Sequence, residues 1–171
     1  MRPGLQLYTL REYGDSVVDR IERVAETSYE GVQVSGLGDD DPAEVADALD
    51  RTGLDAAGAH VDLANIEADP EGVGLEVDVG LASHAGGDPV ALLERYGDRT
   101  TLVHLTDSRA ESDDDEDTRH VDLSEGEVDL AGCIDAAADA GVAWLLFEHG
   151  LSDDPVASME RAEAVIADLL D

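Results

Sequence analysis

Residues 100–107 read TTLVHLTD, and the rest of the chain can be interpreted from this pattern. The run is apolar and rich in β-branched residues, which predicts a strand, and it carries a polar side chain, His104, near its carboxyl end. Five other segments have a similar form: GLQLYTL (4–10), GVQVS (31–35), DAAGAHV (55–61), VGLEVDVG (73–80) and VAWLLFEH (142–149). The sequence therefore predicts six strands.

Helical patterns separate most of these strands. Residues 15–28 place apolar side chains on one helical face, and Asp-Pro pairs at 41–42, 88–89 and 154–155 are typical helix starts. Another helix is predicted over residues 129–140. Alternating strands and helices indicate an α/β fold with a parallel sheet. The exception is the joint at residues 62–72, which is too short for a confident crossover helix.

The polar residues at the strand ends favour a barrel over an open doubly wound sheet. A barrel gathers all its strand ends around one mouth, whereas an open sheet uses only those at its switch point. Polar residues lie at or near the carboxyl end of every predicted strand: Gln6, Tyr8, Gln33, Ser35, His60, Asp78, His104 and Glu148. No glycine-rich phosphate fingerprint follows the first strand. We predict one TIM-barrel-like domain over residues 1–171, built of parallel βα units and reduced to about six strands.

The charge of the chain is extreme, with 42 acidic residues, 10 basic residues and a formal net charge of −32. All the basic residues are arginines. Such a surface repels itself at low salt and becomes tolerable when molar salt shortens the Debye length to about 3 Å, so the composition predicts halophilic adaptation. Nucleic acid is disfavoured as a partner, because its phosphates carry the same sign of charge.

Cys133 is the only cysteine, so no internal disulfide is expected. The amino-terminal MRPGLQLYTL lacks the apolar run of a signal peptide, and no stretch approaches the ~20 apolar residues of a membrane span. These features predict a cytoplasmic protein without a membrane partner.

Three of the strand-end residues form a candidate metal site. Asp78, His104 and Glu148 belong to the last three predicted strands. Two carboxylates and one imidazole suit Mn²⁺, Mg²⁺, Co²⁺ or Zn²⁺. The competing interpretation is chance, since acidic residues are abundant in this chain and a histidine at a strand end often has only a structural role.

The chain resembles the sugar phosphate isomerase/epimerase family, the xylose-isomerase-like branch of TIM barrels. The resemblance lies in GLQLYTLRE at the start, GAHVDL at 58–63, VGLEVDVG at 73–80, DPVALLERYGDRTTLVHLTD at 88–107, EGEVDL at 125–130 and WLLFEHG at 144–150. It implies a divalent metal at the mouth of the barrel, with Asp78, His104 and Glu148 as ligands. It also implies that His60 faces the substrate. Arg109, just beyond VHLTD, is the candidate for a substrate phosphate or hydroxyl, although an ion pair with nearby acids also explains it.

The sequence departs from the family pattern in its middle. The family barrel has eight strands, and the fourth and fifth, with the first glutamate ligand, would fall at the short joint. Leu81 stands where the family tends to carry histidine or a large aromatic residue. Glu76 shares a sheet face with Asp78, so it is either a partial replacement for the lost ligand or a salt-bridged structural residue.

The resemblance implies a metal-dependent isomerase or epimerase of a sugar or sugar phosphate, acting by proton abstraction next to a carbonyl with Glu148 as a base. An inosose dehydratase or isomerase uses the same scaffold. The alternative is an impaired barrel remnant that binds a partner, or a homo-oligomer that covers open sheet edges. A DNA-repair endonuclease of this fold is disfavoured, because it needs more metal ligands and a basic surface.

Overall fold

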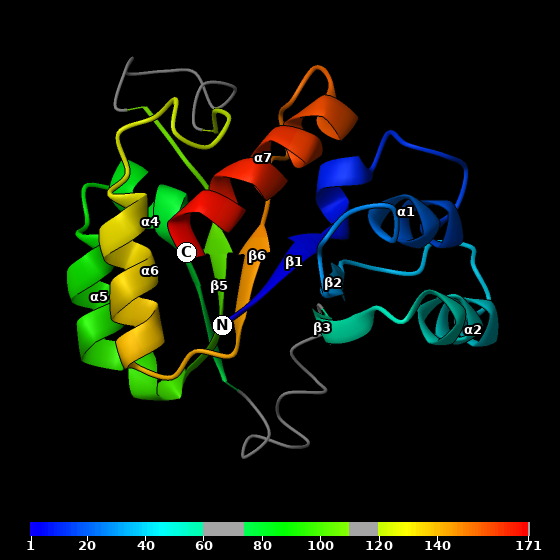
Figure 1. Ribbon diagram of the computed structural model, residues 1–171, viewed down its shortest axis with the longest axis horizontal. Coiled ribbons are helices and arrows are strands. Elements are labelled where there is room, and N and C mark those ends of the chain that lie inside the picture. The colour runs from blue at the N-terminus through cyan, green and yellow to red at the C-terminus, as the bar shows by residue number, and fades with distance from the viewer. Residues whose placement is uncertain (60–73, 110–119, 171) are drawn as a thin grey trace.

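The structure is a computed structural model that describes residues 1–59, 74–109 and 120–170. Within these ranges six strands form one sheet in the order β3-β2-β1-β6-β5-β4, and every pairing is parallel. The strands are β1 (Arg2–Gln6), β2 (Gly31–Val34), β3 (Asp55–Ala59), β4 (Leu75–Asp78), β5 (Thr100–Leu105) and β6 (Trp144–Phe147). The predicted α/β, TIM-barrel-like fold with six strands is confirmed, and the sheet curls into a half-barrel (Figure 1).

Helices connect and cover the strands. They are α1 (Val17–Val24), α2 (Pro42–Thr52), α4 (Val79–His84), α5 (Pro89–Tyr96), α6 (Leu130–Asp139) and α7 (Pro155–Leu170), with 3-10 turns η1 (Leu7–Leu10) and η3 (Gly97–Arg99). Local signals set their ends. Asp41 and Asp88 each precede a proline, and each accepts a hydrogen bond from a backbone amide in the first turn of its helix. Gly53 ends α2 in the left-handed conformation, with φ 74°.

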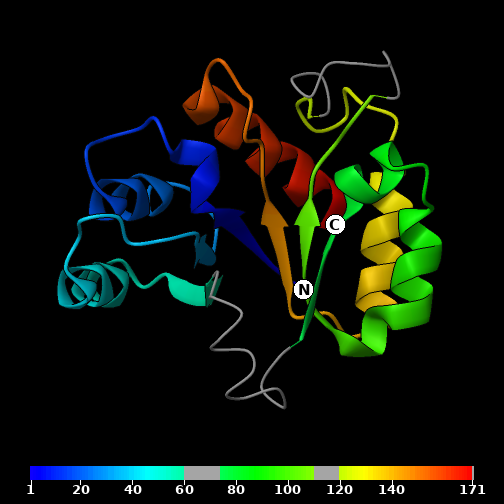
Figure 2. The same ribbon diagram turned by 180° about the vertical axis from the view of Figure 1, so that it is seen from behind.

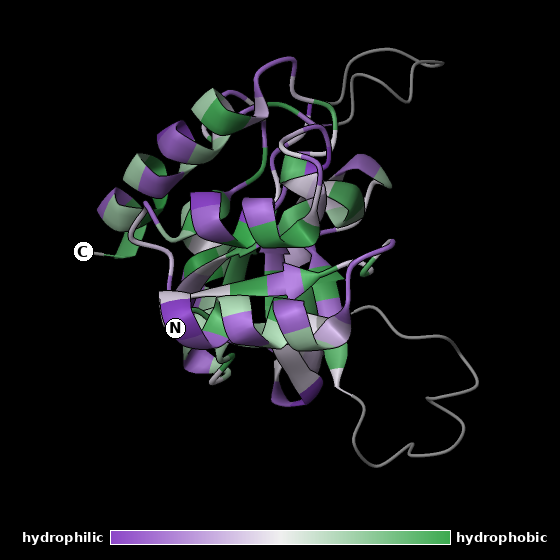
Figure 3. Ribbon diagram, turned by 90° about the vertical axis from the view of Figure 1, so that its right-hand side faces the viewer, coloured by the Kyte–Doolittle hydropathy of each residue, from purple (hydrophilic) through white to green (hydrophobic). Residues whose placement is uncertain are grey.

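The helices lie on the outside of the curved sheet. α1 and α2 stand beside β2 and β3, α5 and α6 stand on the opposite side, and α7 crosses in front of β5 and β6 (Figure 1). From behind, β1, β5 and β6 face the viewer with no described helix in front of them (Figure 2). The hydrophobic core therefore sits on the convex side of the sheet, between strands such as β5 and β6 and the apolar faces of the helices (Figure 3).

The concave face is packed by glycines set opposite bulky side chains. The opposed pairs are Gly31 with Trp144, Gly4 with Leu146 and Gly58 with Leu102. A Cβ atom at Gly31 would lie 2.7 Å from Trp144 Cη2, and one at Gly4 would lie 2.5 Å from Leu146 Cδ2. The glycines lie on β1, β2 and β3 and have no side chains, so they leave room for the large side chains of β5 and β6. This complementarity lets a sheet of six strands fill its own interior.

The strands end earlier than the sequence predicts, and in two of them a polar side chain stops the strand. The predicted strand 4–10 stops at Gln6, because the Gln6 side-chain oxygen accepts a hydrogen bond from the Tyr8 amide (3.0 Å) and turns the chain into η1. The predicted strand 73–80 stops at Asp78, whose carboxylate accepts from the Leu81 amide (2.7 Å) and starts α4. In both places a polar side chain accepts a hydrogen bond from a backbone amide, which in a longer strand would have to pair with an adjacent strand.

Some predictions fall outside the described residues. These are the joint at 62–72 and the role of His60, so the assignment of residues 1–171 to one domain stays a prediction. Cys133 is buried in the core, and burial raises the pKa of its thiol to about 12. No helix in the described part of the chain is long and apolar enough to cross a membrane.

Asp122 links the segment after β5 to α7. Its carboxylate accepts hydrogen bonds from the Ser158 hydroxyl and from the Arg161 guanidinium (Nε 3.0 Å). Partial burial acts to raise the pKa of Asp122, but these hydrogen bonds outweigh burial and hold the pKa below its ordinary value of 3.8. The stabilisation is therefore present above that value and is lost as the pH falls through the folded-state pKa.

We expect Asp122→Asn to lower the free energy of unfolding by about 1.5–3 kcal/mol at pH 7, since hydrogen bonds to a charged group are removed. The difference from the wild type should shrink as the pH drops below 3.8. Urea unfolding of both proteins at one fixed KCl concentration measures it. Equal unfolding midpoints at pH 7 would contradict the assigned role.

Candidate metal centre

Asp78, His104 and Glu148 come together at the carboxyl ends of three neighbouring strands. Asp78 ends β4, His104 lies in β5 directly opposite Asp78 in the register, and Glu148 follows β6. Each residue offers one ligand atom, and these atoms lie within 4.8 Å of one another. The parallel register and the alternation of side chains along each strand place all three on the concave face.

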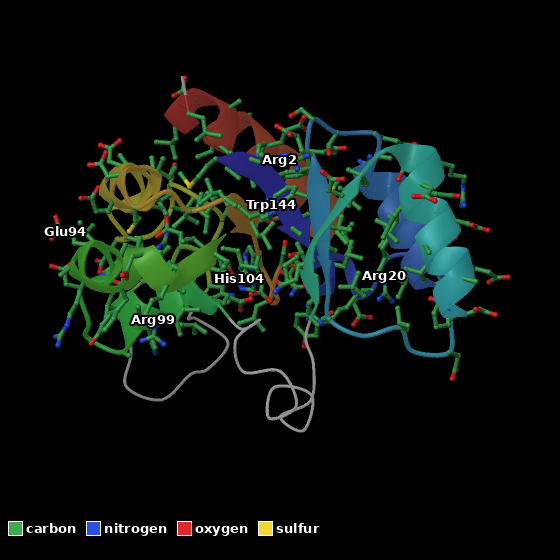
Figure 4. The ribbon with its side chains drawn as sticks, turned by 90° about the horizontal axis from the view of Figure 1, so that it is seen from below. Arg2, Arg20, Glu94, Arg99, His104 and Trp144 are labelled. Atoms are coloured by element: carbon green, nitrogen blue, oxygen red, sulfur yellow. The ribbon has the colours of Figure 1, made fainter. Side chains whose placement is uncertain are left out.

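His104 is the buried centre of this group, with its side chain only 4% exposed. It lies in the interior of the molecule, between the half that carries β4 to β6 and the half that carries β2 and β3 (Figure 4). Its Nδ1 is 2.9 Å from Glu148 Oε2, and its Nε2 is 2.6 Å from Gln33 Oε1. Both ring nitrogens therefore face oxygen atoms.

Gln33 determines which ring nitrogen carries a proton when His104 is neutral. The Gln33 amide nitrogen donates to Glu76 Oε2 (2.6 Å), and a carboxylate only accepts, so the Gln33 oxygen must face His104. The same oxygen accepts from Gln6 Nε2 (2.7 Å). His104 Nε2–H is thus the donor to Gln33, and Nδ1 is the nitrogen directed to the carboxylates.

The carboxylates around His104 stabilise its protonated form more than water stabilises that of an exposed histidine. Burial lowers the pKa of His104, but the adjacent Glu148 carboxylate, helped by Glu76 and Asp78, outweighs burial and raises it above its ordinary value. A divalent cation would replace the Nδ1 proton as the positive charge between the carboxylates. Two carboxylates and an imidazole with a fixed Nε2–H are a donor set that fits such an ion.

Asp78 is held in place by its second function as the cap of α4. Its Oδ1 accepts from the Leu81 amide and from the Thr106 hydroxyl (2.5 Å). Thr106 is fully buried, and its hydroxyl oxygen also accepts from the Gly80 amide (2.7 Å). Both described hydrogen bonds to Asp78 use the same carboxylate oxygen, which orients the carboxylate as a whole.

Glu76 lies on the far side of the imidazole from Glu148. Its Oε1 is 3.6 Å from His104 Nε2, and its other oxygen accepts from Gln33. A cation on Nδ1 would therefore not meet this carboxylate. Of the two interpretations of Glu76, a structural residue paired with its neighbours agrees with this placement, and a replacement ligand does not.

Of the other predicted site residues, the structure describes only Arg109. His60 is outside the described residues. Arg109 is exposed, and its Nε donates to the Glu125 carbonyl (2.8 Å). Its role in binding substrate stays a prediction. His149 is buried on the opposite side of its strand end, where its Nε2 is 3.8 Å from Asp122.

A pocket of about 280 Å³ opens beside the cluster and shares Glu148 with it. It is lined by Tyr8, Arg11, Leu81, His120, Glu148, Gly150 and Leu151. A larger hollow of about 480 Å³ lies between α5 and α6, away from the strand ends, and its polar side chains are only acidic. The smaller pocket is the relevant one, because it adjoins groups that can bind a cation and move a proton.

The network behind His104 escaped the sequence interpretation. Gln6 and Gln33 stand out as polar residues inside apolar strands, yet nothing in the sequence shows that one glutamine bridges β2 to both β4 and β5. The sequence interpretation also missed Arg11 as a pocket residue. It predicted that residues 4–10 form one strand, whereas the chain turns into η1 at Leu7 and brings Arg11 to the pocket. The signal available in the sequence was an amide where a buried strand normally carries an apolar side chain.

The arrangement of strands and cluster agrees with a comparison of sequence families. The family described as "Xylose isomerase-like TIM barrel" matches residues 30–169. The chain belongs to this family. No curated protein matches it by sequence.

Solved structures of xylose isomerase-like barrels share the fold. A sugar phosphate isomerase/epimerase from Parabacteroides distasonis ATCC 8503 has a TM-score of 0.76 at 12% identity, over 98% of each chain. D-allulose 3-epimerase from Methylomonas sp. has 0.66 at 12% identity, over 99% of this chain and 98% of that chain. The IOLI protein, with a bound zinc atom, has 0.66 at 11% identity, over 99% and 98%. These matches span both chains almost end to end.

Proposed function

We propose that this xylose isomerase-like protein is a divalent-metal-dependent isomerase or epimerase acting on a sugar or sugar phosphate. The observation that carries the proposal is the convergence of Asp78, His104 and Glu148 at the mouth of the half-barrel. Mn²⁺, Mg²⁺, Co²⁺ and Zn²⁺ all accept this mixture of oxygen and nitrogen ligands. The neighbours that act on sugars, and the one with bound zinc, lend support at the level of the shared fold.

Glu148 is the proposed base. It contacts His104 on one side and lines the pocket on the other, so its carboxylate can reach a bound molecule. A divalent ion, when bound, would polarise the substrate oxygens. Glu148 takes the proton from the carbon beside the carbonyl and returns it to the former carbonyl carbon, while the hydroxyl proton passes between the two oxygens. Aldose becomes ketose with no atom gained or lost.

Isomerisation needs fewer groups than epimerisation on this account. An epimerase of the kind that the family resemblance implies needs a carboxylate on each face of the substrate, whereas a proton transfer between neighbouring carbons on one face needs one base. Among the described residues that line the pocket, Glu148 is the one carboxylate. We therefore favour an aldose–ketose isomerase, with an inosose dehydratase or isomerase as the variant on the same scaffold.

The test is a metal-dependent exchange assay. The purified protein, with and without Mn²⁺, is incubated in D₂O with a panel of aldose and ketose phosphates and free sugars, and NMR follows both deuterium incorporation and product. We expect deuterium beside the carbonyl with Mn²⁺ only, and none with Asp78→Ala. A protein that binds Mn²⁺ yet exchanges no proton on any member of the panel would refute the proposal.

The second candidate is a barrel remnant that binds a partner or itself. The sheet order supports it, because β3 and β4 are edges with no strand beyond them among the described residues. Unpaired edges can accept a strand of another chain. A dimer that forms through these edges, together with no metal binding, would favour this function over catalysis.

Gln33 is proposed to orient His104 for the metal. Replacing it with leucine removes the acceptor for Nε2–H, so we expect Gln33→Leu to weaken Mn²⁺ binding by about 10–100-fold. Nitrogen-15 NMR of the metal-free protein at alkaline pH should show the Nε2–H tautomer in the wild type. In the variant, the Nδ1–H form should appear. An unchanged tautomer in a folded variant would contradict this role.

A further inference from the structure

The pocket beside Glu148 is bordered by exposed apolar side chains. The described part of the chain exposes only four large hydrophobic residues, and three of them, Tyr8 (46%), Leu81 (40%) and Leu151 (40%), line this pocket. Exposed apolar surface concentrated around a concave site typically marks ligand contact. The three residues come from three separate parts of the chain, η1, α4 and the turn after β6.

Arg11 adds a positive charge to the pocket. Its guanidinium lies over the Tyr8 ring, with Cζ 4.8 Å from the ring centroid. The backbone beneath it is anchored, because its amide donates to the Tyr8 carbonyl (3.1 Å) and its carbonyl accepts from Arg20 Nη2 (2.9 Å). A planar guanidinium stacked on an aromatic ring is restricted in orientation, which favours it as a fixed anion contact.

A purely structural role explains Arg11 less well. Among the described residues Arg11 forms one ion pair, which joins its Nε to Glu12 Oε1 at 3.6 Å, and the Glu12 side chain is 78% exposed. Such a pair contributes little, because solvent screens it and two long side chains must be held together. Most of the surface of a chain with net charge −32 repels anions. A cation in a pocket next to a proton-transfer base is therefore the feature that needs an explanation.

We infer that Arg11 binds an anionic group of the substrate, which in the sugar phosphates of the proposed function is the phosphate monoester. The inference rests on the proposed function and names the substrate class as sugar phosphates. The reacting carbons would lie at Glu148, the apolar face of the sugar on Tyr8, and the phosphate on the Arg11 guanidinium, which can donate two parallel hydrogen bonds. Arg109 is not among the residues lining the pocket, and it already donates to the Glu125 carbonyl.

A binding experiment on the metal-free protein separates this inference from catalysis. The probes are D-fructose 6-phosphate, D-fructose and D-glucuronate, which differ in the presence and type of the anionic group. Dissociation constants are measured by NMR titration for the wild type, Arg11→Gln and the control Arg109→Gln. The KCl concentration is the lowest at which circular dichroism shows folded protein, because molar salt screens charge contacts beyond about 3 Å.

We expect the wild type to bind fructose 6-phosphate about tenfold more tightly than fructose, the effect of one charge-assisted contact. Arg11→Gln should lose this preference, so that fructose 6-phosphate binds it no more tightly than fructose does, and Arg109→Gln should keep the preference. If Arg11→Gln does not fold, Arg11→Lys, which keeps the charge but not the paired donors, should reduce the preference.

Three results would overturn the inference: no preference in the wild type, an intact preference in Arg11→Gln or Arg11→Lys, or tighter binding of glucuronate than of the phosphate. Failure of the proposed function looks different. If the protein prefers the phosphate through Arg11 but never exchanges a substrate proton, the binding site is supported and the isomerase function is refuted.

Discussion

Gly31→Val is expected to prevent folding or to lower the free energy of unfolding by about 3 kcal/mol, a large part of the ~5–15 kcal/mol available to a domain. A Cβ atom at Gly31 would lie 2.7 Å from the Asp55 carbonyl oxygen and 2.7 Å from Trp144 Cη2. The first of these atoms is backbone of the paired strand β3 and cannot move aside without breaking the ladder. Valine adds two methyl groups to the same crowded place.

Gly58→Ala is the matched control on the same face. A Cβ atom there would be 3.2 Å from a flexible leucine side chain, Leu102, so we expect a much smaller loss. Urea unfolding followed by circular dichroism at fixed KCl measures both. A Gly31→Val protein as stable as the wild type would show that the interior has room for the added side chain. The tight curl of six strands would then be the wrong account of this sheet.

Glu148→Gln is expected to reduce turnover by about 10²–10⁴-fold, the range for loss of a positioned base. The amide has nearly the same shape and keeps an oxygen that can accept from His104 Nδ1–H, so the fold should survive. Proton transfer should not, because an amide takes up no proton at neutral pH. The amide is also a poorer metal ligand, so turnover must be compared at saturating Mn²⁺.

Glu76→Gln provides the comparison. It changes a carboxylate on the same face that accepts from Gln33 but lies across the imidazole from Glu148. We expect at most a modest effect on turnover and an unchanged fold. If Glu148→Gln retains the wild-type rate at saturating metal, or if Glu76→Gln loses as much, the base is wrongly assigned.

The sequence predicted the fold well where local signals are strong. Six apolar runs became six parallel strands, and the Asp-Pro starts at residues 41 and 88 became capped helices. The errors lie at strand ends, where single side chains decide. Gln6 and Asp78 each accept a backbone amide and stop a strand that hydrophobicity alone would extend. The halophilic and cytoplasmic assignments stay predictions.

Only the three candidate metal ligands could be predicted from the sequence, and the residues that support them could not. Asp78, His104 and Glu148 follow from their places at the ends of neighbouring strands together with the family resemblance. Their supports do not, because Gln33 reaches His104 across 71 positions of sequence, and periodicity carries no information about such a contact. The glycine at position 31 looks like an ordinary strand start until Trp144 is seen against it.

The measurement that bears most directly on the metal site is a calorimetric Mn²⁺ titration in molar KCl. The proteins are the wild type, Asp78→Ala and the control Glu76→Gln, each first shown to be folded by circular dichroism. We predict saturable binding of about one ion per chain in the wild type and in Glu76→Gln, and none in Asp78→Ala, in line with three ligands at one centre. Absence of binding in all three, or equal binding in all three, would contradict a metal centre at Asp78, His104 and Glu148.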